Sequence, residues 1–251
     1  MVEAAGFDES KFPYTTTHAG VLSKITGIIE KQKSSGSFES QLESASPEAK
    51  ERISHVQDLV TKFKALISNP SFKQSNTKDN CTGYTMKDEK GRIIAKSVGI
   101  IPYSPIEIMA YLNVEYKSEY DDMFKEASDI DVYPCNCKMI NQRFKGKWPT
   151  KSRDFLMLSQ EVYMDDGTIY VVASSFPDDA KCPPHKDYVR AQVIIGAWEF
   201  KPAEGGKSYV TYISHTDLCG KIPKILSNSV FKKQSLMVGK FTAAMIKKLK
   251  K

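Results

Sequence analysis

Lys117 and Asp121 are charged residues whose spacing could serve chemistry inside a fold. They stand four residues apart, so on a helix their side chains share one face. If both were buried, an ammonium and a carboxylate would have to pair with each other, and they would form a polar end to an apolar site. The same spacing is common on exposed helices, where such pairs contribute little to stability. From the residues alone, both interpretations remain open.

Three other groups of residues resemble reactive sites, and each lacks a necessary part. Cys182 and His185 have one zinc-like spacing, but a structural zinc needs four ligands and no second pair is nearby. Cys135 and Cys137 would face the same side of a strand, which favours a packed core. Residues 214–217, Ser-His-Thr-Asp, have triad residue types but no Gly-x-Ser-x-Gly turn elsewhere. We therefore expect no metal, no cofactor and no enzymatic activity.

Trp148 lies in the lysine-rich segment 145–151, which we expect to be a turn between two strands. Lysines make deep burial of the whole segment improbable. An indole favours the headgroup region of a bilayer, and nearby lysines are attracted to anionic surfaces. We expect Trp148, Lys147 and Lys151 to dock the protein transiently on membranes. The alternative is that Trp148 folds back over the edge of the sheet.

The C-terminal segment 220–251 is predicted to form one long amphipathic helix. Pro223 suits its first turn, and the terminal lysines suit its last. A helix of this length spans roughly 40 Å, enough to cross a small domain. Its apolar stripe consists of Leu226, Val230, Met237, Phe241 and Met245.

Upstream of this helix, the hydrophobic period predicts an antiparallel sheet. The run 189–198 is apolar on both faces, which is typical either of a packed core or of a lined cavity. The long connection 176–188 is a stiff loop rather than a hairpin. Two helical pieces, 103–112 and 116–124, interrupt the strands. We expect strands at 82–87, 92–101, 130–134, 136–144, 155–164, 168–175, 189–200 and 209–216.

The first 45 residues are predicted to be an extension made of a short helix and a linker. The helix covers about 15–31, and the Ser- and Gly-rich segment 33–46 reads as the linker. Ser46 followed by Pro47 then starts a helix that runs to Ile67. We therefore divide the chain into an extension, 1–45, and one domain, 46–251.

The composition of the 251 residues excludes several classes of protein. A net charge of +6, with acidic and basic residues interspersed, does not indicate a nucleic-acid partner. Five cysteines spread along the chain favour a reducing compartment, so we expect a cytoplasmic protein. The sequence contains neither a signal-peptide pattern nor an apolar run long enough to span a bilayer. Its oligomeric state is left open.

The chain contains an ordered set of short motifs, which are Ser152 to Leu156, Val189 to Ala191, Gly196 to Trp198, Thr211 to Ile213 with Asp217 and Gly220, and Ile222 to Lys224 leading to Asn228. This set resembles the START family of steroidogenic-acute-regulatory-related lipid-transfer domains. The resemblance covers about Ser46 to Lys251. It implies an α+β helix-grip fold, in which a curved antiparallel sheet wraps around the C-terminal helix and encloses a tunnel for one lipid. That helix and the loop 176–188 would form a lid.

The resemblance also implies which residues meet the lipid. The acid–base pair of sterol carriers is replaced by Ile140 and Ser159. Of the aromatic cage of phosphatidylcholine carriers only Phe155 is aromatic, since the second position is Ile194. Lys117, Asp121 and Gln142 match the head-group residues of ceramide carriers, followed by Trp148-Pro149 as in that branch. The expected tunnel lining is Ile140, Phe155, Met157, Ile194, Leu226, Val230, Met237 and Phe241.

Three functions follow from this resemblance. The first is a carrier that binds one amphipathic lipid, of phospholipid or ceramide type, and transfers it between membranes. The second is a lipid-sensing adaptor, in which residues 1–45 dock a protein partner. The third is an enzyme of the cyclase or thioesterase type on the same fold, for which Asp121 is the one candidate acid–base group.

Overall fold

Nine strands form the centre of the molecule. The structure is a computed structural model that describes residues 7–78 and 80–249. In these ranges the strands are β1 (Lys73–Lys78), β2 (Cys81–Lys87), β3 (Ile93–Ile101), β4 (Phe124–Tyr133), β5 (Cys137–Phe144), β6 (Ser152–Tyr163), β7 (Ile169–Ser175), β8 (Tyr188–Ala203) and β9 (Lys207–Asp217).

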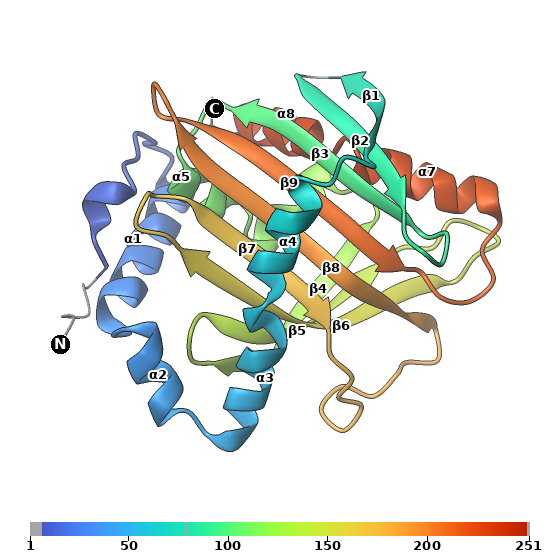
Figure 1. Ribbon diagram of the computed structural model, residues 1–251, viewed down its shortest axis with the longest axis horizontal. Coiled ribbons are helices and arrows are strands. Elements are labelled where there is room, and N and C mark those ends of the chain that lie inside the picture. The colour runs from blue at the N-terminus through green and yellow to red at the C-terminus, as the bar shows by residue number, and fades with distance from the viewer. Residues whose placement is uncertain (1–6, 79, 250–251) are drawn as a thin grey trace.

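The strands form a single sheet with the order β1-β2-β3-β9-β8-β7-β6-β5-β4 (Figure 1). Neighbouring strands in this order are antiparallel. Because β7 is short, the first residues of β6 and β8 pair directly and in parallel, from Ser152 opposite Tyr188 to Phe155 opposite Ala191. The expected strands are present. The additional strand β1 was not predicted, because its sequence, KQSNTK, is polar and almost entirely exposed at the sheet edge.

The helices flank this sheet on both faces. They are α1 (Ala19–Ser34), α2 (Phe38–Ser44), α3 (Pro47–Gln57), α4 (Leu59–Ile67), α5 (Pro105–Tyr111), α6 (Lys117–Tyr120), α7 (Lys224–Gln234) and α8 (Met237–Leu249), with the 3₁₀ turns η1 (Glu9–Lys11) and η2 (Val114–Tyr116).

Helices α3 and α4 cross one face of the sheet (Figure 1). The Ser46 hydroxyl accepts a hydrogen bond from the Ala49 N–H, and Pro47 takes the first helical position, as the sequence predicts. The expected single helix to Ile67 is interrupted at Asp58. The buried side chains Ile53 and Phe63 pack here against the sheet. The resulting core excludes water from this face.

Helices α1, α5 and α8 cover the other face and share a second core. Trp198 of β8 contributes to it, with Phe241 from α8 and Ile25 from α1. The fold is thus the α+β helix-grip architecture that the sequence predicts. Between these helices and the sheet, this face also leaves room for a cavity.

The C-terminal helix is divided in two, so the prediction of one continuous helix is wrong. The chain turns at Ser235 and Leu236 between α7 and α8. Gly83 explains the position of the break, because a Cβ there would lie 2.4 Å from the Ser235 carbonyl oxygen. At the start of α8, the Val238 N–H donates to the buried Ser97 hydroxyl at 3.0 Å. The predicted end at Lys250 and Lys251 lies outside the described residues.

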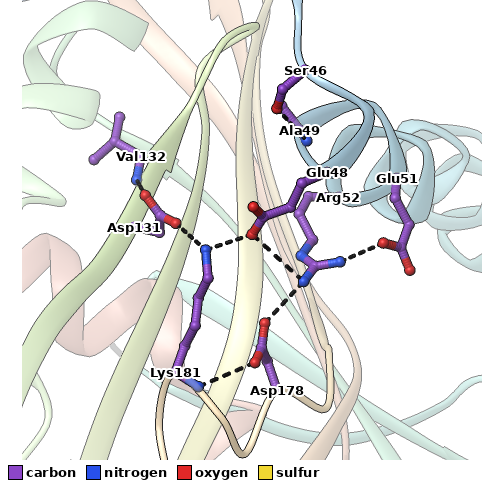
Figure 2. Close-up of polar contacts among 9 residues, drawn as sticks. All are labelled: Ser46, Glu48, Ala49, Glu51, Arg52, Asp131, Val132, Asp178 and Lys181. Carbon is purple, nitrogen blue, oxygen red and sulfur yellow. Dashed lines mark hydrogen bonds and ion pairs between the residues drawn. The ribbon is translucent and has the colours of Figure 1, made fainter.

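Ion pairs join the loop 176–187 to α3 (Figure 2). Arg52 Nη2 of α3 lies 2.9 Å from Asp178 Oδ2 in the loop, and both side chains are almost buried. Lys181 in the same loop pairs with carboxylates of α3 and β4, those of Glu48 and Asp131. None of the loop residues borders the cavity described below. The expectation that this loop covers the tunnel is therefore wrong.

The N-terminal region is more ordered than predicted. The presumed linker contains α2, whose N-cap is Ser37. Helix α1 begins after His18, which accepts from the Val21 N–H through its side chain. Its residues Val21, Ile25 and Ile29 belong to the same core as α8. The domain division at residue 45 remains a prediction, and residues 1–6 of the extension lie outside the described ranges.

Candidate functional site

A cavity of about 790 Å³ lies between the sheet and the helices of its second face. Strands β4 to β9 supply the floor. Helices α1, α5, α6 and α7 and the start of α8 supply the walls, and the loop after β5 borders one end. A drug-sized or lipid-sized molecule needs a space of this order, with mostly apolar lining and few polar groups.

Six of the eight predicted lining residues border this cavity. Side chains on alternate positions of β5 and β6 point to the same face of the sheet, which places three of them there. The other three come from the divided C-terminal helix. The six are Ile140, Phe155, Met157, Leu226, Val230 and Met237.

Ile194 and Phe241 do not border the cavity, so both predictions need correction. The register of β8 against β9 shifts between Val193 and Ile195, and this bulge removes Ile194 from the regular alternation. Val193 and Gly196 line the cavity instead. Phe241 is fully buried, and its ring contacts the rings of Tyr120 and Trp198 at centroid distances of 4.8 and 5.4 Å.

Lys117 and Gln142 form the polar contact inside the cavity. Lys117 Nζ donates to Gln142 Oε1 at 2.6 Å, across from α6 to β5. The rings of Phe124 and Phe144 each lie with their centroids 5.4 Å from this ammonium. Burial lowers the pKa of Lys117 to about 8, an effect that the negative charge of Asp121 partly opposes. An ammonium in such surroundings favours an acceptor or an anion that enters the cavity.

Asp121 borders the same cavity, but it does not form the expected ion pair with Lys117. The helix α6 ends at Tyr120, and Asp121 has an extended backbone with φ −123°. Its side chain therefore leaves the helical i, i+4 alignment, and Asp121 Oδ1 accepts from the Met123 N–H at 3.1 Å. The carboxylate and the ammonium thus share the cavity without direct contact.

Two exposed apolar side chains stand beside one end of the cavity. Trp148, in the loop after β5, is 89% exposed, and Ile225, at the start of α7, is 82% exposed. Their neighbours Lys147 and Leu226 both border the cavity. The expected exposure of Trp148 is thus observed, and the alternative of a side chain folded over the sheet is wrong. Lys151 is exposed as well.

Arg153 and Tyr212 are lining residues with polar contacts that the sequence did not assign to the site. The Arg153 guanidinium donates to three backbone oxygens, including those of Leu218 and Cys219, and so holds the connection from β9 to α7. The Tyr212 hydroxyl donates to Gln234 Oε1 at 2.6 Å, at the last residue of α7. Both residues belong to motifs of the START resemblance, but local sequence does not indicate their contacts with Leu218, Cys219 and Gln234, which lie 22 or more residues away along the chain.

No cluster of three or more His, Cys, Asp or Glu side chains suitable for a metal ion exists within residues 7–78 and 80–249. Over the same ranges, no helix has the length and apolarity needed to cross a bilayer.

A family model described as START domain matches residues 67–251. The chain belongs to the START domain family. Proteins with this domain bind or transfer lipids, which supports lipid binding in general.

Solved structures agree with this fold. Human StAR-related lipid transfer protein 5 has a TM-score of 0.70 at 18% identity, covering 80% of this chain and 97% of its own. The crystal structure of human STARD10 has a TM-score of 0.66 at 21% identity, covering 76% of this chain and 79% of its own. Identities this low show the fold and not the ligand.

Sequence relatives match shorter stretches. START domain-containing protein 10 of Homo sapiens is 27% identical over 116 residues, or 46% of this chain and 39% of that protein. The homeobox-leucine zipper protein ATHB-8 of Arabidopsis thaliana is 28% identical over 103 residues, or 39% of this chain and 12% of that protein. The matches thus span well under half the length of these relatives. They do not separate one lipid class from another.

The motif residues that carry the START resemblance hold together the strands that form the cavity floor. Asp154 is buried, and its Oδ2 lies 2.9 Å from Nη2 of Arg190, which joins the second motif to the first. The rings of Trp198 and Tyr212 contact each other at a tilt of 40°, with their centroids 4.4 Å apart. These pairs fix the strands, and Trp198 and Tyr212 also border the cavity.

Proposed function

We propose that this START domain carries one amphipathic lipid, of phospholipid or ceramide type, and transfers it between membranes. The observation that carries the proposal is the combination of a cavity of about 790 Å³ with a buried polar cluster, Lys117, Gln142 and Asp121, that borders it. Apolar walls suit acyl chains, and the cluster offers both donors and an acceptor to a head group.

The cluster favours a head group with hydroxyl, amide or phosphate oxygens. The Lys117 ammonium supplies donors, while Asp121 accepts. A lysine provides a point charge rather than the bidentate fork of an arginine, so it suits several oxygen geometries. A choline cation finds less support, because Ile194 lies off the cavity and the Lys117 charge repels it.

The surface beside the cavity supports exchange with membranes. We propose that Trp148, Lys147 and Lys151 touch the bilayer, and the structure adds Ile225 as a second exposed apolar residue. Two apolar side chains and a few lysines provide a weak and reversible attachment. A carrier needs this, because it must also leave the membrane. We place this activity in the cytoplasm, with no chemical conversion of the lipid.

Two measurements test the proposal. Native mass spectrometry of the purified protein should show one bound lipid, and a fluorescent lipid should move between two liposome populations. The Val230→Asp variant should lose both, since it places a charge on the cavity wall. The matched control is Asn228→Asp, which adds the same charge to the exposed side of α7. A wild-type protein that transfers no lipid would refute the carrier function, and unchanged transfer by Val230→Asp would show that this cavity does not hold the lipid.

A lipid-sensing adaptor is the alternative. It would bind the same lipid and fail to transfer it, so the liposome assay separates the two. If the protein binds lipid but does not transfer it, we propose the adaptor role, in which residues 1–45 bind a protein partner.

A further inference from the structure

Helix α1 forms part of the cavity wall, although it lies upstream of the matched START region, which begins at residue 67. Four of its residues, Lys24, Gly27, Ile28 and Lys31, border the cavity. Their spacing places them on one helical stripe. The neighbouring stripe, with Val21, Ile25 and Ile29, is buried in the core. One helix thus serves both the core and the cavity.

This wall stands at the end of the sheet opposite the Trp148 loop. Gln32, near the end of α1, exchanges two hydrogen bonds of 3.1 Å with Asn136, in the turn before β5. The Trp148 loop follows the other end of β5. At about 3.3 Å per residue, the eight residues of β5 separate these ends by roughly 25 Å. In the view of Figure 1, α1 lies at the left end of the sheet and α7 at the right end.

Helix α1 is held along its whole length, so it acts as a fixed wall rather than as a lid. Before its first turn, the N–H groups of Thr15 and Thr16 donate to Oε1 of Glu107, which is 1% exposed. Beyond its last turn, Gln41 of α2 accepts from the Cys135 N–H at 2.8 Å. Release of the helix would break these contacts together with its core packing.

Charged residues mark where an apolar chain has to stop. At the α1 end the cavity is bordered by Lys31, Glu161 and the ion pair of Lys138 with Asp129, whose atoms are 3.3 Å apart. An apolar chain that passed these groups would strip water from them without replacing their hydrogen bonds. The charges at α1 therefore mark one end of the apolar compartment.

Gly27 is the position at which this compartment can be shortened. A Cβ built on Gly27 meets no other atom within 4 Å, and the residue faces the cavity. Ile28 beside it is half-buried. The absence of a side chain at residue 27 leaves space that the end of a lipid chain can fill.

We propose that α1 is a chain-length selector of the lipid site: it closes the end of the cavity opposite Trp148, and the open space at Gly27 sets the longest acyl chain that fits. This inference rests on the proposed lipid-carrier function. The ligand class is a lipid with one or more acyl chains, and the head group stays at Lys117 and Gln142.

The test uses the full chain with Gly27→Trp, Gly27→Leu and the control Thr26→Trp. Thr26 is the adjacent, exposed residue and does not border the cavity, so it receives the same indole outside the site. Each protein is offered liposomes with phosphatidylcholines and ceramides whose acyl chains increase by two carbons at a time. Bound lipid is identified by native mass spectrometry, and thermal melting shows that each variant is folded.

We expect Gly27→Trp to shift the preference toward shorter chains, by at least about tenfold for each pair of carbons beyond the new limit. Gly27→Leu should give a smaller shift in the same direction, and it replaces Gly27→Trp if the larger residue impairs folding. Thr26→Trp should match the wild type. If the wild type binds lipid and both Gly27 variants prefer the same chain lengths as the wild type, the inference is overturned. If the wild type binds neither these lipids nor other phospholipids of the same chain lengths, the proposed function fails, and this inference fails with it.

Discussion

The Lys117 ammonium donates a 2.6 Å hydrogen bond to Gln142 Oε1, so a side chain of α6 and one of β5 meet inside the cavity. Gln142→Leu removes this acceptor and leaves the ammonium without it. We expect a loss of about 1–3 kcal/mol in the free energy of unfolding of the lipid-free protein, together with altered head-group selectivity. Chemical denaturation and lipid competition measure the two effects. If Gln142→Leu and Asp121→Ala both retain the wild-type selectivity, these residues do not bind the head group.

The depressed pKa of Lys117 predicts a pH dependence of stability. Its pKa is about 8 in the folded protein against 10.5 as the ordinary value, so the unfolded state binds more protons between these pH values. The burial cost of the charged amine applies in full below pH 8 and disappears above 10.5. Stability should therefore rise with pH in this window, relative to Lys117→Met, in denaturation series at several pH values. Parallel curves for the two proteins would contradict the prediction.

Trp148→Ala and Ile225→Ser should slow lipid transfer and weaken liposome binding several-fold. Both side chains are exposed, so neither change should alter the free energy of unfolding by more than about 0.5 kcal/mol. Val132→Ser is the matched control, because Val132 is 66% exposed on β4 and does not border the cavity. Liposome flotation and transfer rates give the readout. Equal effects of all three variants would indicate a general surface effect instead of a docking site.

Gly83→Ala should destabilise the protein, whereas Gly27→Ala should not. A Cβ at residue 83 would lie 2.4 Å from the Ser235 carbonyl, and the backbone there must move. Such overpacking costs about 1–3 kcal/mol. At Gly27 the new methyl meets nothing within 4 Å, and alanine is favoured over glycine in a helix by about 1 kcal/mol. Thermal melting of the two variants compares them directly. Similar melting temperatures would show that the helix break does not depend on Gly83.

Arg52→Leu should release the loop 176–187 without opening the cavity. Asp178, whose side chain is 11% exposed, would lose its partner, at a cost of about 3 kcal/mol. Trypsin should then cleave faster after Lys181 in the loop. Because this loop does not border the cavity, lipid transfer at a temperature where the variant is folded should remain unchanged. A large loss of lipid transfer under those conditions would show that the loop contributes to the site.

Much of the fold follows from local patterns. Alternating strands, the Ser46-Pro47 helix start and the amphipathic C-terminal segment depend on neighbours within a few residues, so their positions are predictable. The exposure of Trp148 also follows locally, from the lysines around it. Strand β1 escaped prediction because an exposed polar edge strand carries no hydrophobic period.

The site itself depends on contacts that only the tertiary structure creates. The residue types Lys117, Gln142 and Asp121 could be singled out from the chain, yet their pairing could not, because the end of α6 at Tyr120 turns Asp121 aside. The break before α8 requires Gly83 and Ser97, which are more than a hundred residues away in sequence. Helix α1 joins the cavity only because its core stripe packs beside α5 and α8. Local sequence determines which elements form, and the packing of distant elements decides which of their residues face the lipid.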